Sequence, residues 1–231
     1  IGNDLATTGA LTAASVTATG AVSGATVEAT GDIISGDDVI VPGLTGDAIK
    51  MGDSVSSDYG YHDMLGEIRV RTVAAQSPAW EQIGATPFWG YNFDVNDRVW
   101  QTFHIPHDYV PGSDIFIHTH WVPDGTDTNS VKWEYTYAYA KGHNQDNYDL
   151  TGTVITAEES PPGTIYRHMV TETAAITIPD MEVDGMLKVM VRRITNGGTD
   201  NADGIFVDTS DIHYQSTGLP TANRAPNFYN T

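Results

Sequence analysis

The sequence predicts an all-β protein in which an N-terminal oligomeric β-fibre segment precedes a jelly-roll-like antiparallel β-sandwich. Two features predict this class. A repeat of eleven residues runs through the first forty residues, and after about residue 64 apolar and polar side chains alternate with period two, as in strands with one buried face. The chain has 231 residues, of which 40% are apolar, so it can bury a true core.

The repeat keeps its phase through three Thr-Gly pairs, at residues 8–9, 19–20 and 30–31. Ordering its residues costs roughly 1–2 kcal/mol of backbone entropy each, whereas burying two aliphatic side chains per repeat returns only about 1.5–3 kcal/mol apiece. Identical chains wound round a common axis can share these apolar groups and pair their strand edges. We therefore expect a homotrimeric stalk over residues 1–41, with a flexible linker as the alternative. The side chains expected along the trimer seam are Leu11, Val16, Val22, Val27 and Ile33.

A connector is expected over residues 42–63 and the sandwich head over residues 64–231. The only helical competitor in the head is the segment 73–83, and Pro78 limits it to one short turn because proline removes a backbone donor. The head is therefore expected to consist of strands alone.

Eight strands are expected, separated by turns rich in Pro, Gly, Asn and Asp. The clearest is the segment 131–140, in which Trp133 and Tyr135 fall on one face. Eight antiparallel strands in a domain of this size suit a jelly roll or a related Greek-key sandwich. The eight expected strands are residues 67–73, 86–95, 99–105, 114–122, 131–140, 165–178, 186–194 and 205–215.

The amino-acid composition excludes several classes of partner and site. The chain has 30 acidic and 11 basic side chains and a formal net charge of −19, so it is unsuited to binding a phosphate backbone, and no nucleic acid is expected as a partner. No apolar run approaches the length of a membrane span. Cysteine is absent, which excludes disulfides, thiolate zinc sites and a cysteine nucleophile.

Histidines are the best candidates for chemistry. His118 and His120 alternate in an expected strand and therefore share one face. With Gly112 upstream, this stretch resembles the first motif of the cupins, a jelly-roll family whose His-x-His pair holds a transition metal. Cupins carry a glutamate four or five positions after the second histidine, and here those positions hold Asp124 and Gly125. The resemblance implies an alternative function, a cupin-like metal-dependent enzyme using His104, His107, His118 and His120. The commoner behaviour of such histidines is to bond neighbouring hydroxyls and carboxylates.

Other sites are less well supported. The loops 124–129, 144–149 and 200–204 could offer calcium several oxygens, but none has the full spaced ligand set, so we expect these residues to form turns and expect no cofactor. Gly-x-Ser-x-Gly and His-Glu-x-x-His are absent, and no pair of carboxylates stands out for glycoside hydrolysis. We therefore expect a protein that is not an enzyme.

Residues 19–31, Thr-Gly-Ala-Val-Ser-Gly-Ala-Thr-Val-Glu-Ala-Thr-Gly, resemble the shaft repeats of tailed-bacteriophage fibres. Residues 105–122 and 211–216 are similar to β-sandwich heads of phage virion proteins. The resemblance implies a homotrimeric virion component, a fibre or a capsid decoration protein, attached to other virion proteins through its N-terminal end. Its exposed head would contact host surface glycans through Trp and Tyr faces. The resemblance implies no catalytic residues.

Overall fold

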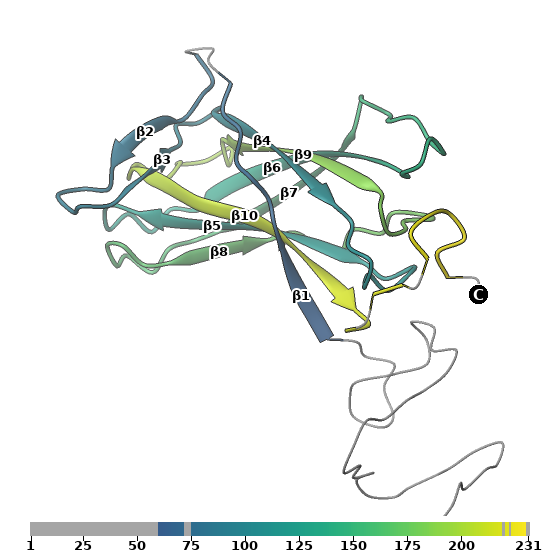
Figure 1. Cartoon of the computed structure of the whole chain (residues 1–231). Helices are drawn as coiled ribbons and strands as arrows, with labels where there is room; N and C mark the ends of the chain where they lie inside the picture. Colours follow the sequence, from purple (N-terminus) through teal and green to yellow (C-terminus); the bar gives the residue numbers. More distant parts are fainter. Residues whose placement is uncertain (1–59, 72–74, 219, 222, 230–231) are drawn as a thin grey trace, which may run out of the picture. The chain divides into compact units, whose positions relative to one another are not determined.

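The computed structural model describes residues 60–71, 75–218, 220–221 and 223–229. The repeat lies outside the described residues, and so do the expected seam positions Leu11, Val16, Val22, Val27 and Ile33. The described part of the chain contains ten strands, and no helix in it is long and apolar enough to cross a membrane (Figure 1). The strands are β1 (Gly60–Leu65), β2 (Ala79–Gln82), β3 (Trp89–Asn92), β4 (Arg98–His104), β5 (Ile115–Pro123), β6 (Val131–Ala140), β7 (Thr153–Glu159), β8 (Met169–Glu172), β9 (Met186–Ile194) and β10 (Ile205–Ser216).

The strands form two antiparallel sheets. The first has the order β2-β3-β10-β5-β8, and the second has the order β4-β9-β6-β7. The eight strands β3 to β10 thus have the arrangement of a jelly roll, which confirms the predicted all-β class and the predicted sandwich of the head. Strand β10 is long enough for β3 to pair with its beginning and β1 with its end, on the edge opposite β5 (Figure 1).

The core lies between the two sheets. Trp121 of β5 and Trp133 of β6 are fully buried there, and the ring of Phe93 meets that of Trp133 edge-on at 5.4 Å between centroids. The predicted face of β6 is confirmed, because Trp133 and Tyr135 are buried while Lys132, Glu134 and Thr136 are only partly covered. Period-two alternation places these side chains in the core because successive residues of a strand point to opposite faces.

Three strands differ from the expectation. Strand β1 begins at Gly60, so residues 60–63 of the expected connector pair with β10 and belong to the sandwich. Residues 79–82 form strand β2 and not a helical turn. Strand β7 was not expected, because most of its side chains are exposed and only Ile155 and Ala157 pack against the core. Such an edge strand is held by backbone pairing to β6, which side-chain pattern does not reveal.

Three expected strands are shorter than predicted. Within residues 86–95 only β3 is a strand. Within residues 67–73 the described part makes only an isolated bridge, between Arg69 and Trp100. Within residues 165–178 only β8 is a strand, and the residues before it form a turn with Tyr166 at a positive φ of 59°. This turn contributes to a pocket beside strands β2 and β3.

Candidate functional site

A pocket of about 480 Å³ lies beside the β2–β3 hairpin. Pockets for small ligands commonly have volumes of roughly 300–1,000 Å³, mostly apolar walls and a few polar groups. This pocket has that character, because its lining combines three aromatic rings and two aliphatic side chains with two hydroxyls, of Thr86 and Tyr166, and one carboxylate. It is lined by Ile83, Thr86, Phe88, Trp89, Val122, Tyr166 and Asp208.

The β2–β3 turn holds two of the aromatic rings outward. Ile83 donates its backbone N–H to Phe88 O at 2.9 Å, and the Thr86 hydroxyl donates to Ile83 O at 2.8 Å. Phe88 is 70% exposed and Trp89 is 53% exposed. Large apolar side chains that remain exposed beside a pocket mark a binding surface more often than a chance feature of the fold.

Tyr166 forms the opposite wall. Its backbone N–H donates to Pro123 O at 2.9 Å, which anchors the turn to the end of β5. The left-handed backbone at Tyr166 is strained for a bulky residue, and such strain occurs preferentially at functional sites. Gly84 has a φ of +53°, and a Cβ at this position would overlap the Tyr166 hydroxyl. Glycine at position 84 is therefore required for the ring to lie where it does.

Asp208 supplies the pocket with its carboxylate because β10 is irregular at this point. The pairing of β10 with β5 shifts between Val207 and Thr209, so Asp208 is an extra residue in a β-bulge. Bulges redirect side chains and are frequent next to sites. Partial desolvation raises the pKa of Asp208, while the nearby His168 and His120 act in the opposite direction. The pocket therefore combines aromatic faces with a single hydrogen-bonding carboxyl group.

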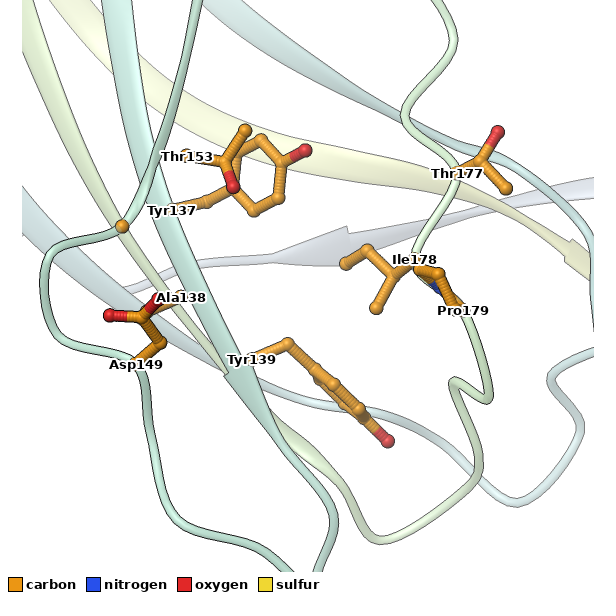
Figure 2. Close-up of a pocket in the computed structure, with 9 residues that line it drawn as sticks. Tyr137, Ala138, Tyr139, Asp149, Thr153, Thr177, Ile178 and Pro179 are labelled. Carbon is orange, nitrogen blue, oxygen red and sulfur yellow. The ribbon is translucent and has the colours of Figure 1, made fainter.

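A second hollow of about 210 Å³ lies at the end of β6, where Tyr137 and Tyr139 face Ile178 and Pro179 across the opening (Figure 2). Three of its polar side chains, Tyr139, Asp149 and Thr177, already have partners within the protein. The Tyr139 hydroxyl donates to Glu182 O and accepts from Glu182 N at 3.0 Å. This hollow is smaller than typical ligand pockets, so the pocket beside the hairpin is the better candidate.

The four histidines of the alternative metal site fall into two separate groups. His104 and His107 lie at the end of β4, where both Nε2 atoms contact Asp184 Oδ1, at 3.0 and 3.1 Å. His143 contacts the other oxygen of Asp184 at 2.8 Å. These contacts with the Asp184 carboxylate match the hydrogen-bonding behaviour that is expected of histidines in strands.

His118 and His120 project from the opposite face of β5 to the core residues Thr119 and Trp121. His118 Nε2 contacts Glu172, and His120 Nε2 contacts Asp211 Oδ1 at 3.0 Å. The structure therefore confirms that these two histidines share a face. Each of the two groups, His104 with His107 and His118 with His120, has its own carboxylate partners, so the four histidines of the alternative metal site do not form one cluster.

The loops considered for calcium use their carboxylates to bind backbone N–H groups. Asp127 accepts hydrogen bonds from the backbone of Asn129 and Ala202, and these bonds lower its pKa. Asp124 accepts from Gly204 N at 2.7 Å. Asp149 accepts from the backbone and the hydroxyl of Thr151. These contacts are those expected of turn-forming residues.

No protein-family description matches the chain, and no curated protein matches it in sequence. Several solved structures are similar in fold. Dimeric latent PorU from Porphyromonas gingivalis has a TM-score of 0.35 and 8% identity, over 69% of this chain and 13% of PorU, so this chain spans only a small part of that protein. TmCBM61, solved in complex with β-1,4-galactotriose, has a TM-score of 0.27 and 13% identity over 68% of this chain and 91% of that one. Eiger TNF from S. frugiperda has a TM-score of 0.27 and 10% identity over 73% of this chain and 98% of that one.

The residues that line the pocket do not form a recognisable motif in the sequence. One signal was available, the adjacent aromatics Phe88 and Trp89 after Pro87. Neighbouring residues of a strand point to opposite faces, so both rings cannot enter the same core. The contribution of Asp208 was not visible, because nothing local distinguishes a bulge from a regular strand.

Proposed function

We propose that this protein is a structural virion component of a tailed bacteriophage whose jelly-roll head binds a neutral glycan. The pocket lined by Phe88, Trp89, Tyr166 and Asp208 carries the proposal. Aromatic faces bury the apolar C–H surface of a sugar ring, and a carboxyl group accepts hydrogen bonds from its hydroxyls. The net charge of −19 favours a neutral glycan over an anionic one, because like charges repel.

The assignment to a virion rests on the eleven-residue repeat and its resemblance to phage fibre shafts. In this proposal residues 1–41 form the stalk of a homotrimer and attach to other virion proteins, as a fibre or a capsid decoration. A trimer presents three copies of the pocket, so weak individual sites combine into strong attachment. The protein acts by binding and not by catalysis.

The glycan-binding proposal is tested with the full-length protein on an array of immobilised neutral oligosaccharides. Trp89→Ala should weaken binding by about tenfold or more, equivalent to about 1.4 kcal/mol. Trp80→Ala is the matched control, because Trp80 is 57% exposed and lies outside the pocket lining. Absence of binding to every glycan, or equal losses in both variants, would refute a glycan site in this pocket.

The virion proposal has a separate test. Peptides of this chain should be found by mass spectrometry in purified phage particles, and immunogold labelling should place the head on their outer surface. Detection only in lysate and never in the particle would rule out a structural role in the virion.

A further inference from the structure

Three potential metal ligands meet on the outer face of the β10–β5 pair. One ligand atom from each of His118, Asp211 and His213 lies within 4.8 Å of the other two. His118 is 5% exposed and Asp211 is 2% exposed, and the His118 and His213 rings are 3.7 Å apart between centroids. A carboxylate buried beside two imidazoles is costly unless its charge is compensated.

Strand register explains why these residues meet. Asp211 of β10 lies directly opposite His118 of β5, and His213 follows two positions later on the same face. The same row continues on the other side of His118 to Glu172 of β8. Ligands from two neighbouring paired strands are held by the ladder of backbone hydrogen bonds, so the group does not depend on a loop.

Each of the two histidine ligands also contacts a carboxylate through its Nε2 atom. His118 Nε2 contacts Glu172 Oε2 at 2.5 Å, and His213 Nε2 contacts an Asp63 oxygen. These contacts leave the Nδ1 atoms of His118 and His213 without a hydrogen-bond partner among the residues that the structure describes. Histidines that bind metals commonly donate their other ring N–H to a carboxylate in this way.

The third ligand is supported in the same manner. Asp211 Oδ1 contacts His120 Nε2 at 3.0 Å, and His120 Nδ1 in turn contacts His168 at 2.9 Å. Three carboxylates, Asp63, Glu172 and Asp211, therefore surround the His118–His213 pair. A divalent cation would offset this concentration of negative charge.

We propose that His118, His213 and Asp211 bind one divalent transition-metal ion of the Zn²⁺ class. Two imidazoles and one carboxylate are ligands that such ions accept, with the remaining coordination positions filled by water. The site takes only His118 from the histidines considered in the sequence, and its other two ligands come from β10. Bound metal cross-links β5 to β10 and, through Asp63, holds β1 against the sheet.

The test is titration of chelator-treated full-length protein with Zn²⁺ at pH 7.5 by calorimetry. We expect one ion per chain and a higher melting temperature with Zn²⁺. Asp211→Asn keeps the side-chain shape and His213→Ala removes a partly exposed ligand, so both should abolish binding. Glu172→Gln, at an exposed position, should weaken binding about 10–100-fold, as expected for a residue that only orients a ligand.

His143→Ala is the control, because His143 belongs to the separate group around Asp184. Binding that survives in this variant but not in His213→Ala supports the site. Absence of Zn²⁺ binding in the wild type, unchanged binding in His213→Ala and Asp211→Asn, or loss in His143→Ala would each overturn it. Folding of every variant is verified by circular dichroism, and the exposed Glu172→Gln variant provides the result if a buried substitution prevents folding.

Discussion

The hydroxyl groups of Thr119 and Tyr135 share a hydrogen bond of 2.9 Å in the middle of the core. Thr119 belongs to β5 and Tyr135 to β6, so this bond joins the two sheets of the jelly roll. Both side chains are fully buried, and burial raises the pKa of Tyr135 above its ordinary value. The bond satisfies two polar groups that water cannot reach.

Tyr135→Phe should therefore lower the free energy of unfolding by about 1–3 kcal/mol, because it leaves the Thr119 hydroxyl buried without a partner. In a domain of this size each kcal/mol corresponds to about 2–4 °C in melting temperature. The double variant Tyr135→Phe with Thr119→Val removes both polar groups and should recover most of the loss. A double variant no more stable than the single one would contradict this explanation.

A charge substitution at Asp184 should change how stability depends on pH. Hydrogen bonds from His143 and then His107 lower the pKa of Asp184, and the nearby His104 acts in the same direction. Because the folded pKa is lowered, the carboxylate stabilises the fold above the ordinary aspartate pKa of about 3.9, and this contribution is lost as pH falls through the folded value. Asp184→Asn should therefore lower the melting temperature at pH 7, and the difference from wild type should shrink towards pH 3.

Asparagine tolerates the positive φ of 60° at this position, so the substitution tests charge and not backbone strain. Asp146→Asn, at an exposed carboxylate, is the control and should change the melting temperature little. A deficit in Asp184→Asn that is equally large at pH 3 and pH 7 would show that the charge is not responsible.

Gly84→Ala should disturb the pocket. The new Cβ would overlap the Tyr166 hydroxyl, and alanine at a φ of +53° carries strain of roughly 1–3 kcal/mol. We expect both a lower melting temperature and weaker retention on neutral glycans. Gly197→Ala has the same kind of strain at a φ of +77° but meets no atom within 4 Å, so it should affect stability alone. If Gly84→Ala bound glycans as well as the wild type, the placement of the Tyr166 ring would not be needed for glycan binding.

Val22→Asp tests the stalk. If Val22 lines a shared axis, the substitution places several like charges in an apolar seam, where unpaired charge is costly. Native mass spectrometry should find a trimer for the wild type and a smaller species for the variant. Ser23→Asp adds the same charge beside the seam and should be tolerated. A wild-type monomer at micromolar concentration would contradict the trimer itself.

Local pattern was sufficient to predict the class of the head and the faces of its main strands. Alternation assigns Trp133 and Tyr135 to the core because the pleat repeats every two residues wherever the strand pairs. It also places His118 and His120 on one face. The same reasoning did not find β7, in which only Ile155 and Ala157 pack against the core.

The sequence by itself determined that this chain is a cysteine-free, acidic β-protein that carries an eleven-residue repeat with few apolar groups. Only the tertiary structure decided which side chains meet. His118 acquires its neighbour Asp211 because β10 lies beside β5, far away in sequence, and Asp208 reaches the pocket because of a bulge in that pairing. These contacts depend on strand order and register, which arise from packing of the whole sandwich and leave no signal in any short segment.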